Sequence, residues 1–152
     1  MRDRHNERLV AVCQPGHRLA GAAPAQDAAA ALAAEQWLVF PTRPGAAGEP
    51  YAAAIHQLLA AHGLAAATMV PVDSLTAQKR MVEAGFGLAV LPESGIAEEL
   101  AAGTLATLGG PALTRTIPVA LVRRRRGFAS GAVQALAAML TDGHAGVETE
   151  LA

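Results

Sequence analysis

Residues 78–92, with the sequence QKRMVEAGFGLAVLP, constrain the fold of this chain more than any other segment. Their first part has apolar residues at helical spacing, and their last part, 88–91, is an uninterrupted apolar run that ends at a proline. Only the Gly-Phe-Gly tripeptide at 85–87 separates the two parts. Because glycine readily takes positive φ angles, this spacing predicts a helix that reverses directly into a buried strand. A dinucleotide-binding fingerprint has the opposite order, strand before helix, so the segment is not a phosphate-binding loop.

Strand-like and helix-like segments alternate along the rest of the chain. Apolar runs predict further strands at 9–13, 37–40, 68–72, 104–108 and 116–122. Helical spacing or alanine-rich composition predicts helices at 25–34, 51–62, 75–84, 94–102 and 131–140. Pro71 favours an edge position for its strand, and Asp73 or Ser74 is expected to cap the helix that follows. The alternation predicts an α/β fold with a mixed, mostly parallel sheet.

The charge balance of the chain restricts its partners. The 152 residues suffice for one domain and carry a formal net charge of −1. A dedicated nucleic-acid-binding domain usually shows a clear basic excess, so no direct DNA binding is expected. No apolar run reaches the roughly 18 residues of a membrane-spanning helix, and the N-terminus lacks the apolar region of a signal peptide. These features predict a cytoplasmic protein with no membrane partner.

Few side chains in the sequence suggest catalysis or metal binding. Cys13 is the only cysteine, which excludes an internal disulfide and a zinc site built on a cysteine pair. None of the five histidines forms an HxH or HxxxH pair, so no metal and no cofactor is expected. His17 has no serine, cysteine or carboxylate at a recognisable motif spacing. The chain is therefore not expected to be an enzyme.

Four segments, in order, are similar to segments of the effector-binding domain of LysR-type transcriptional regulators. They are ERLVAVCQPGHRLAG, EQWLVFPTRPG, VDSLTAQKRMVEAGFGLAVLP and RTIPVALVRRRRGFASGAVQALAAML, and they extend over about residues 7–142. The resemblance implies a type 2 periplasmic-binding-protein-like fold, in which two α/β lobes enclose a small ligand. It also implies that the chain senses a small polar or anionic metabolite as part of a transcriptional regulator.

The same resemblance implies a division of the chain. Residues 1–8 are expected to form a disordered or hinge lead-in, 9–126 one complete effector-binding lobe, 127–142 the final helix of the first lobe, and 143–152 a tail. The winged helix-turn-helix and the front half of the first lobe have no counterpart here, so the chain resembles a truncated regulator. Because the final helix then lacks its usual support, association with a second copy or with a full-length regulator is expected.

The candidate effector contacts follow two predicted strands. Thr42 and Arg43 come after the strand at 37–40; the family commonly places Thr or Ser near this position, and an arginine can pair with a carboxylate. Val72, Asp73 and Ser74 open the next helix, whose free N–H groups favour an anion. The alternative interpretation is a solvated loop and an ordinary helix cap.

Other interpretations of the sequence stay open. A lobe of a type 2 solute-binding protein of a transport system has the same fold, but it should carry a secretion signal or lipid anchor. The arginine block at 123–126 is either a phosphate or nucleic-acid patch or, as we favour, a solvated strand end. Cys13 lies in an apolar run and is interpreted as a small core residue rather than a redox sensor.

Overall fold

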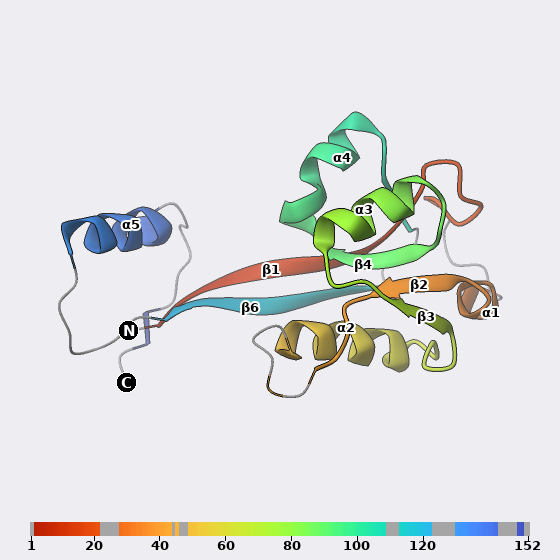
Figure 1. Ribbon diagram of the computed structural model, residues 1–152, viewed down its shortest axis with the longest axis horizontal. Coiled ribbons are helices and arrows are strands. Elements are labelled where there is room, and N and C mark those ends of the chain that lie inside the picture. Colours follow the sequence, from red (N-terminus) through yellow and green to blue (C-terminus); the bar gives the residue numbers. More distant parts are fainter. Residues whose placement is uncertain are drawn as a thin grey trace. The chain divides into compact units, whose positions relative to one another are not determined.

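The structure is a computed structural model that describes residues 2–21, 28–43, 45, 49–108, 113–122, 130–142 and 149–150 (Figure 1). The chain divides into two compact units, Arg8–Arg115 and the combination of Met1–Glu7 with Thr116–Ala152. All the candidate effector contacts belong to Arg8–Arg115. No helix in the described ranges is long and apolar enough to cross a membrane.

Strands and helices alternate as predicted, and most boundaries fall within a few residues of the predicted ones. The elements are β1 (Arg2–Cys13), α1 (Ala28–Ala33), β2 (Gln36–Val39), α2 (Glu49–Ala61), β3 (Thr68–Pro71), α3 (Leu75–Glu83), β4 (Leu88–Pro92), the 3-10 helix η1 (Glu93–Ile96), α4 (Ala97–Ala102), β5 (Ala106–Thr107), β6 (Thr114–Val122), α5 (Gly131–Asp142) and β7 (Thr149–Glu150). The α/β fold class is confirmed.

The sheet has the strand order β3-β2-β4-β1-β5, and β6 and β7 also pair with β1. Strand β2 is parallel to both β3 and β4, whereas β1 is antiparallel to β4, β5 and β7. The sheet is therefore mixed, as predicted, but the antiparallel pairs of β1 make it less parallel than the sequence indicated. Strand β3, which ends at Pro71, lies at the edge of this order, which confirms the effect of the proline.

Strand β1 is longer than the strand predicted at 9–13. It begins at Arg2, and residues of the segment expected to form a C-terminal tail pair with it, since Thr149 lies opposite Asp3 in the register of β7. The apolar pattern missed this extension because residues 2–8 are all polar or charged.

The core of Arg8–Arg115 lies on both faces of the sheet. Figure 1 shows α3 and α4 on one face and α2 on the other. One cluster under α3 and α4 contains buried residues from β1, β2, β4, α3, η1 and the connection between α4 and β5: Val10, Val12, Leu38, Val82, Ala89, Leu91, Ile96 and Leu105. Because side chains alternate across a strand, the buried residues between them, such as Trp37 and Val90, face the side of α2. The central strands β2 and β4, with β1 from Leu9 onward, are therefore buried on both faces, as their continuous apolar runs indicated.

The turn from α3 into β4 follows the prediction from the Gly-Phe-Gly tripeptide. Gly85 has a φ of +80°, and the Phe86 N–H donates to the carbonyl of Met81 (2.9 Å), which closes the end of α3. Glycine is required at position 87 for a different reason, because a Cβ atom there would lie 2.6 Å from the carbonyl oxygen of Gln36 on β2. The two glycines thus permit a reversal and a close approach of two strands.

Candidate functional site

The candidate site lies where β2 and β3 end. The two strands are parallel, with Val39 opposite Pro71, so the loops that follow them both start at the carboxyl ends of the strands, on the same side of the sheet. The Val72 N–H donates to the Val39 carbonyl (2.8 Å), and the Val72 carbonyl accepts from Nε2 of Gln78 (2.7 Å). Gln78 is fully buried on α3. Both the N–H and the carbonyl of Val72 are therefore hydrogen-bonded, which fixes the position of Asp73 and Ser74 next to it.

The structure brings two of the predicted residues into contact. Nη2 of Arg43 lies 3.4 Å from Oδ2 of Asp73, and the two side chains are 67% and 70% exposed. Thr42 is exposed next to Arg43, and Val72 is half-buried. Arg43, from the loop after β2, and Asp73, from the start of α3, thus form one charged surface at the edge of the sheet.

Ser74 is the residue that caps α3. Its backbone is extended, with φ −135° and ψ 121°, and its Oγ accepts a hydrogen bond from the Ala77 N–H (3.3 Å). The prediction left the cap open between Asp73 and Ser74, and the structure assigns it to Ser74. A hydroxyl that accepts one bond still has a proton to donate, so capping leaves Ser74 able to donate to a ligand.

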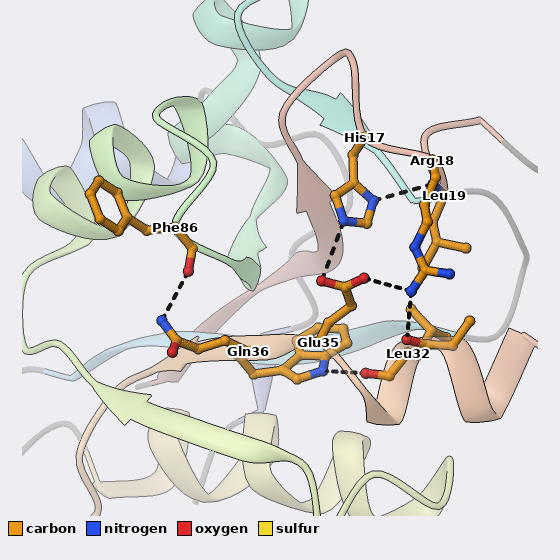
Figure 2. A network of polar contacts seen from close by, with 9 residues as sticks. His17, Arg18, Leu19, Leu32, Glu35, Gln36 and Phe86 are labelled. Carbon is orange, nitrogen blue, oxygen red and sulfur yellow. Dashed lines mark hydrogen bonds and ion pairs between the residues drawn. The ribbon is translucent and has the colours of Figure 1, made fainter.

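A second polar cluster, shown in Figure 2, joins the loop after β1 to the connection between α1 and β2. Oε1 of Glu35 accepts from Nη2 of Arg18 (2.8 Å), and Oε2 lies 3.5 Å from Nε2 of His17. Burial acts to raise the pKa of the Glu35 carboxyl, but the hydrogen bonds from Arg18 and His17 and the positive charge of Arg18 outweigh it and lower that pKa. Nδ1 of His17 accepts from the Leu19 N–H (3.2 Å), so both of its ring nitrogens have partners.

This second cluster connects segments that are distant in sequence. His17 and Glu35 are far apart in sequence, so motif spacing could not reveal their contact. In the same view, Nε2 of Gln36 donates to the Phe86 carbonyl (2.9 Å), and the Phe86 side chain is exposed. Together these bonds connect β1, β2 and the turn before β4.

A third charged cluster ties α3 to α4. Nζ of Lys79 lies 2.6 Å from Oε1 of Glu99 and donates to the Gly95 carbonyl (3.0 Å). The hydrogen bond from Lys79 lowers the pKa of the Glu99 carboxyl. Beside it, the Thr104 hydroxyl donates to Glu83 (2.7 Å), and this bond, with one from Arg80, lowers the pKa of the Glu83 carboxyl. These contacts connect α3 to η1, α4 and the segment that follows α4.

Metal ligation finds no support in the ranges that the structure describes, where no three His, Cys, Asp or Glu side chains gather. The arginine block at 123–126, the other charged feature of the sequence, lies outside the described residues.

Comparison with protein families gives one match. The sequence matches the LysR substrate binding domain over residues 4–145, which is nearly the whole of its 152 residues. A search of curated proteins finds no match.

Solved structures share the fold at low sequence identity. The regulatory domain of Synechocystis CcmR in complex with 2-PG has a TM-score of 0.70 and 20% identity, over 95% of this chain and 68% of that one. The bromide-bound regulatory domain of Salmonella typhimurium HypT has a TM-score of 0.62 and 19% identity, over 93% and 64%. DNA-bound Vibrio fischeri DarR, a LysR-type (LTTR) family member, has a TM-score of 0.64 and 16% identity, over 93% and 45%. The chain thus spans about two thirds or less of each of these relatives.

Proposed function

The chain belongs to the LysR substrate-binding domain family, and from this membership we propose that the ends of β2 and β3 bind a small polar or anionic effector. This family forms the effector-binding, regulatory part of LysR-type transcriptional regulators, and its type 2 periplasmic-binding-protein-like fold is the fold of this chain. The transport-protein alternative is not favoured, because the similar structures named above are regulators or their regulatory domains.

The observation that carries the proposal is the exposed guanidinium of Arg43 beside the start of α3. In open α/β sheets, ligands bind beyond the carboxyl ends of parallel strands, and both Arg43 and Asp73 follow such ends. A guanidinium presents paired donors that match a carboxylate or phosphate. The hydroxyls of Thr42 and Ser74 add neutral donors, and the N-terminus of α3 adds a positive partial charge. Val72, whose N–H and carbonyl are both hydrogen-bonded, anchors the segment that carries Asp73 and Ser74.

Two of the relatives give this proposal further support. CcmR was solved in complex with 2-PG, and HypT was solved with a bromide ion. A fold that accepts a small molecule in one relative and an anion in another is consistent with a small polar or anionic effector here.

The remaining functional expectations extend the same proposal. The chain acts as a sensor without catalysing a reaction and without a cofactor, it does not bind DNA by itself, and it works in the cytoplasm. LysR-type regulators act as oligomers, and this chain associates with a second copy or with a full-length regulator. Residues 9–126 act as an effector-binding lobe, preceded by a lead-in at 1–8, and 127–142 act as the final helix before a tail at 143–152.

A thermal-shift screen of small metabolites tests the proposal. We expect one or more polar or anionic compounds to raise the melting temperature, because a ligand at about 100 times its Kd stabilises a protein by about 2.7 kcal/mol. The shift should shrink in Arg43→Gln and Thr42→Val and persist in Arg8→Gln, which removes an arginine from another exposed ion pair. The proposal fails if no compound shifts the wild-type chain, or if Arg43→Gln and Arg8→Gln respond alike.

A further inference from the structure

We propose that Asp73 is an internal competitor of the effector: its carboxylate occupies the Arg43 guanidinium until an oxyanion displaces it. This inference rests on the proposed function, because it concerns the same site. It goes further because it names the class of ligand, an anion with two oxygens that can both accept hydrogen bonds from one guanidinium. It also assigns to Asp73 a role that opposes effector binding.

The geometry of the ion pair shows that it is easily opened. The Arg43–Asp73 contact is a single nitrogen–oxygen approach of 3.4 Å between side chains that are both about two-thirds exposed. The Lys79–Glu99 pair, in contrast, measures 2.6 Å between side chains that are only 17% and 11% exposed. Exposed pairs contribute little stability, so the Arg43 guanidinium can change partners at small cost.

The nature of Asp73 makes it a competitor rather than a ligand for an anion. Its carboxylate has the same charge as the proposed effector, and like charges at close range repel. The neighbouring groups that can face an anion, namely the hydroxyls of Thr42 and Ser74 and the first N–H groups of α3, can all donate a hydrogen bond to it. Among these groups Asp73 is the one anion, and it is paired with the cation Arg43.

The exchange of Asp73 for a ligand also favours oxyanions over neutral polar molecules. A carboxylate or phosphate can present two oxygens to one guanidinium, and such bidentate pairs are stronger than a single contact. Among the residues that the structure describes, Asp73 makes one contact with the guanidinium, through Oδ2. An oxyanion free to align with the guanidinium therefore replaces Asp73 with a net gain, whereas a neutral polar molecule leaves the Arg43–Asp73 pair in place.

Titration with inorganic phosphate tests this inference directly. The side-chain Nε–H signal of Arg43 would be followed by NMR at constant ionic strength in the wild-type chain, in Asp73→Asn and in Arg43→Gln, whose missing signal identifies the resonance. We expect Asp73→Asn to lower the half-saturating phosphate concentration about two- to fivefold, because an exposed ion pair is worth little and its loss removes only that much competition.

A matched control separates competition from a general change in charge. Glu93→Gln removes one negative charge from the Arg8–Glu93 pair, which has the same 3.4 Å separation and is also exposed. It should leave the phosphate titration at Arg43 unchanged. Tighter binding in both Asp73→Asn and Glu93→Gln would mean that net charge alone acts, and the competitor role would be overturned.

The remaining outcomes distinguish this inference from the proposed function. If phosphate binds at Arg43 but Asp73→Asn weakens or does not change the binding, Asp73 is a supporting residue; the competitor role is wrong and the effector site stands. If neither chain responds to phosphate, the oxyanion inference is overturned. The metabolite screen then decides independently whether the site binds a neutral polar effector.

Discussion

The carbonyl oxygen of Gln36 lies 2.6 Å from the position that a Cβ atom would occupy at Gly87. Real Cβ atoms do not approach backbone oxygen this closely, so only glycine permits β2 and β4 to pair as they do. This pairing places Trp37 opposite Leu88 in the centre of the sheet. The second glycine of the tripeptide therefore determines a strand contact, not only the turn.

Gly87→Ala should lower the free energy of unfolding by about 1–3 kcal/mol, the usual cost of forcing an added methyl into a packed region. Urea denaturation measures this change. Gly16→Ala is the control, because nothing lies within 4 Å of its Cβ position, and it should stay within about 0.5 kcal/mol of wild type. Equal effects of the two substitutions would show that the close approach to Gln36 does not exist in solution.

The ion pair between Lys79 and Glu99 should contribute more to stability than the exposed pairs. Lys79→Met leaves a largely buried carboxylate at Glu99 without its cation, and we expect a loss of about 1–3 kcal/mol. Arg8→Gln breaks the exposed pair with Glu93 and should cost less than about 1 kcal/mol. Urea unfolding of the two variants at neutral pH gives the comparison, and a smaller loss for Lys79→Met would contradict the assigned burial.

Local signals in the sequence predicted much of the fold for physical reasons. The reversal at Gly85, the cap at Ser74 and the edge strand ending at Pro71 each depend on backbone chemistry that one or two residues carry. The first half of β1 was missed because residues 2–8 are all polar or charged and so show no apolar pattern. The predicted ends of several helices and strands differ from the observed ones by a few residues, because helix ends fray and the local sequence defines them only weakly.

The candidate site was predictable only in part. Parallel strands predict that the loops after β2 and β3 share an edge, so Arg43 and Asp73 could be placed together in advance. The contact of His17 with Glu35 depends on how the loop after β1 folds against α1, which no local spacing encodes. Features set by neighbouring residues or by the parallel pairing of strands could therefore be predicted, whereas contacts that depend on how a loop folds could not.

Cys13 should be unreactive in the folded protein. It is fully buried, and desolvation raises the pKa of its thiol from 9.0 to about 11. Ellman's reagent at about pH 8 should therefore modify Cys13 only after denaturation, since the thiolate is the reactive form. Rapid modification of the native protein would show that β1 opens readily at this position.

The same thiol should make stability depend on alkaline pH. The unfolded thiol ionises near 9.0 and the folded thiol near 11, so the unfolded state loses its proton first. This contribution to stability is complete below about pH 9 and decreases as the pH rises toward about 11. Cys13→Ala has no thiol to ionise, so the difference between the unfolding free energies of wild type and Cys13→Ala should narrow over this range. A constant difference would contradict the raised pKa.

Helix α5 carries the largest group of exposed apolar side chains among the described residues. Val133, Leu136, Met139 and Leu140 are 52%, 57%, 73% and 46% exposed, respectively. Burying a side chain of this size is worth about 1.5–3 kcal/mol, so two copies gain by covering such a face. We therefore predict that the weight-average mass in sedimentation rises with concentration. Leu136→Lys should return the chain toward monomer, because its charge would have to be buried in the contact.

The control for this prediction lies on the same helix. Ala138 is two residues from Leu136, which places it about 200° around the helix axis, away from the apolar face. Ala138→Lys adds the same charge at nearly the same place in the chain and should leave the association unchanged. If both lysine variants dissociate the protein equally, net charge governs the association rather than α5. If the wild-type chain stays monomeric at every concentration, the face is covered in solution, and strong protection of its amides from hydrogen exchange would accompany that result.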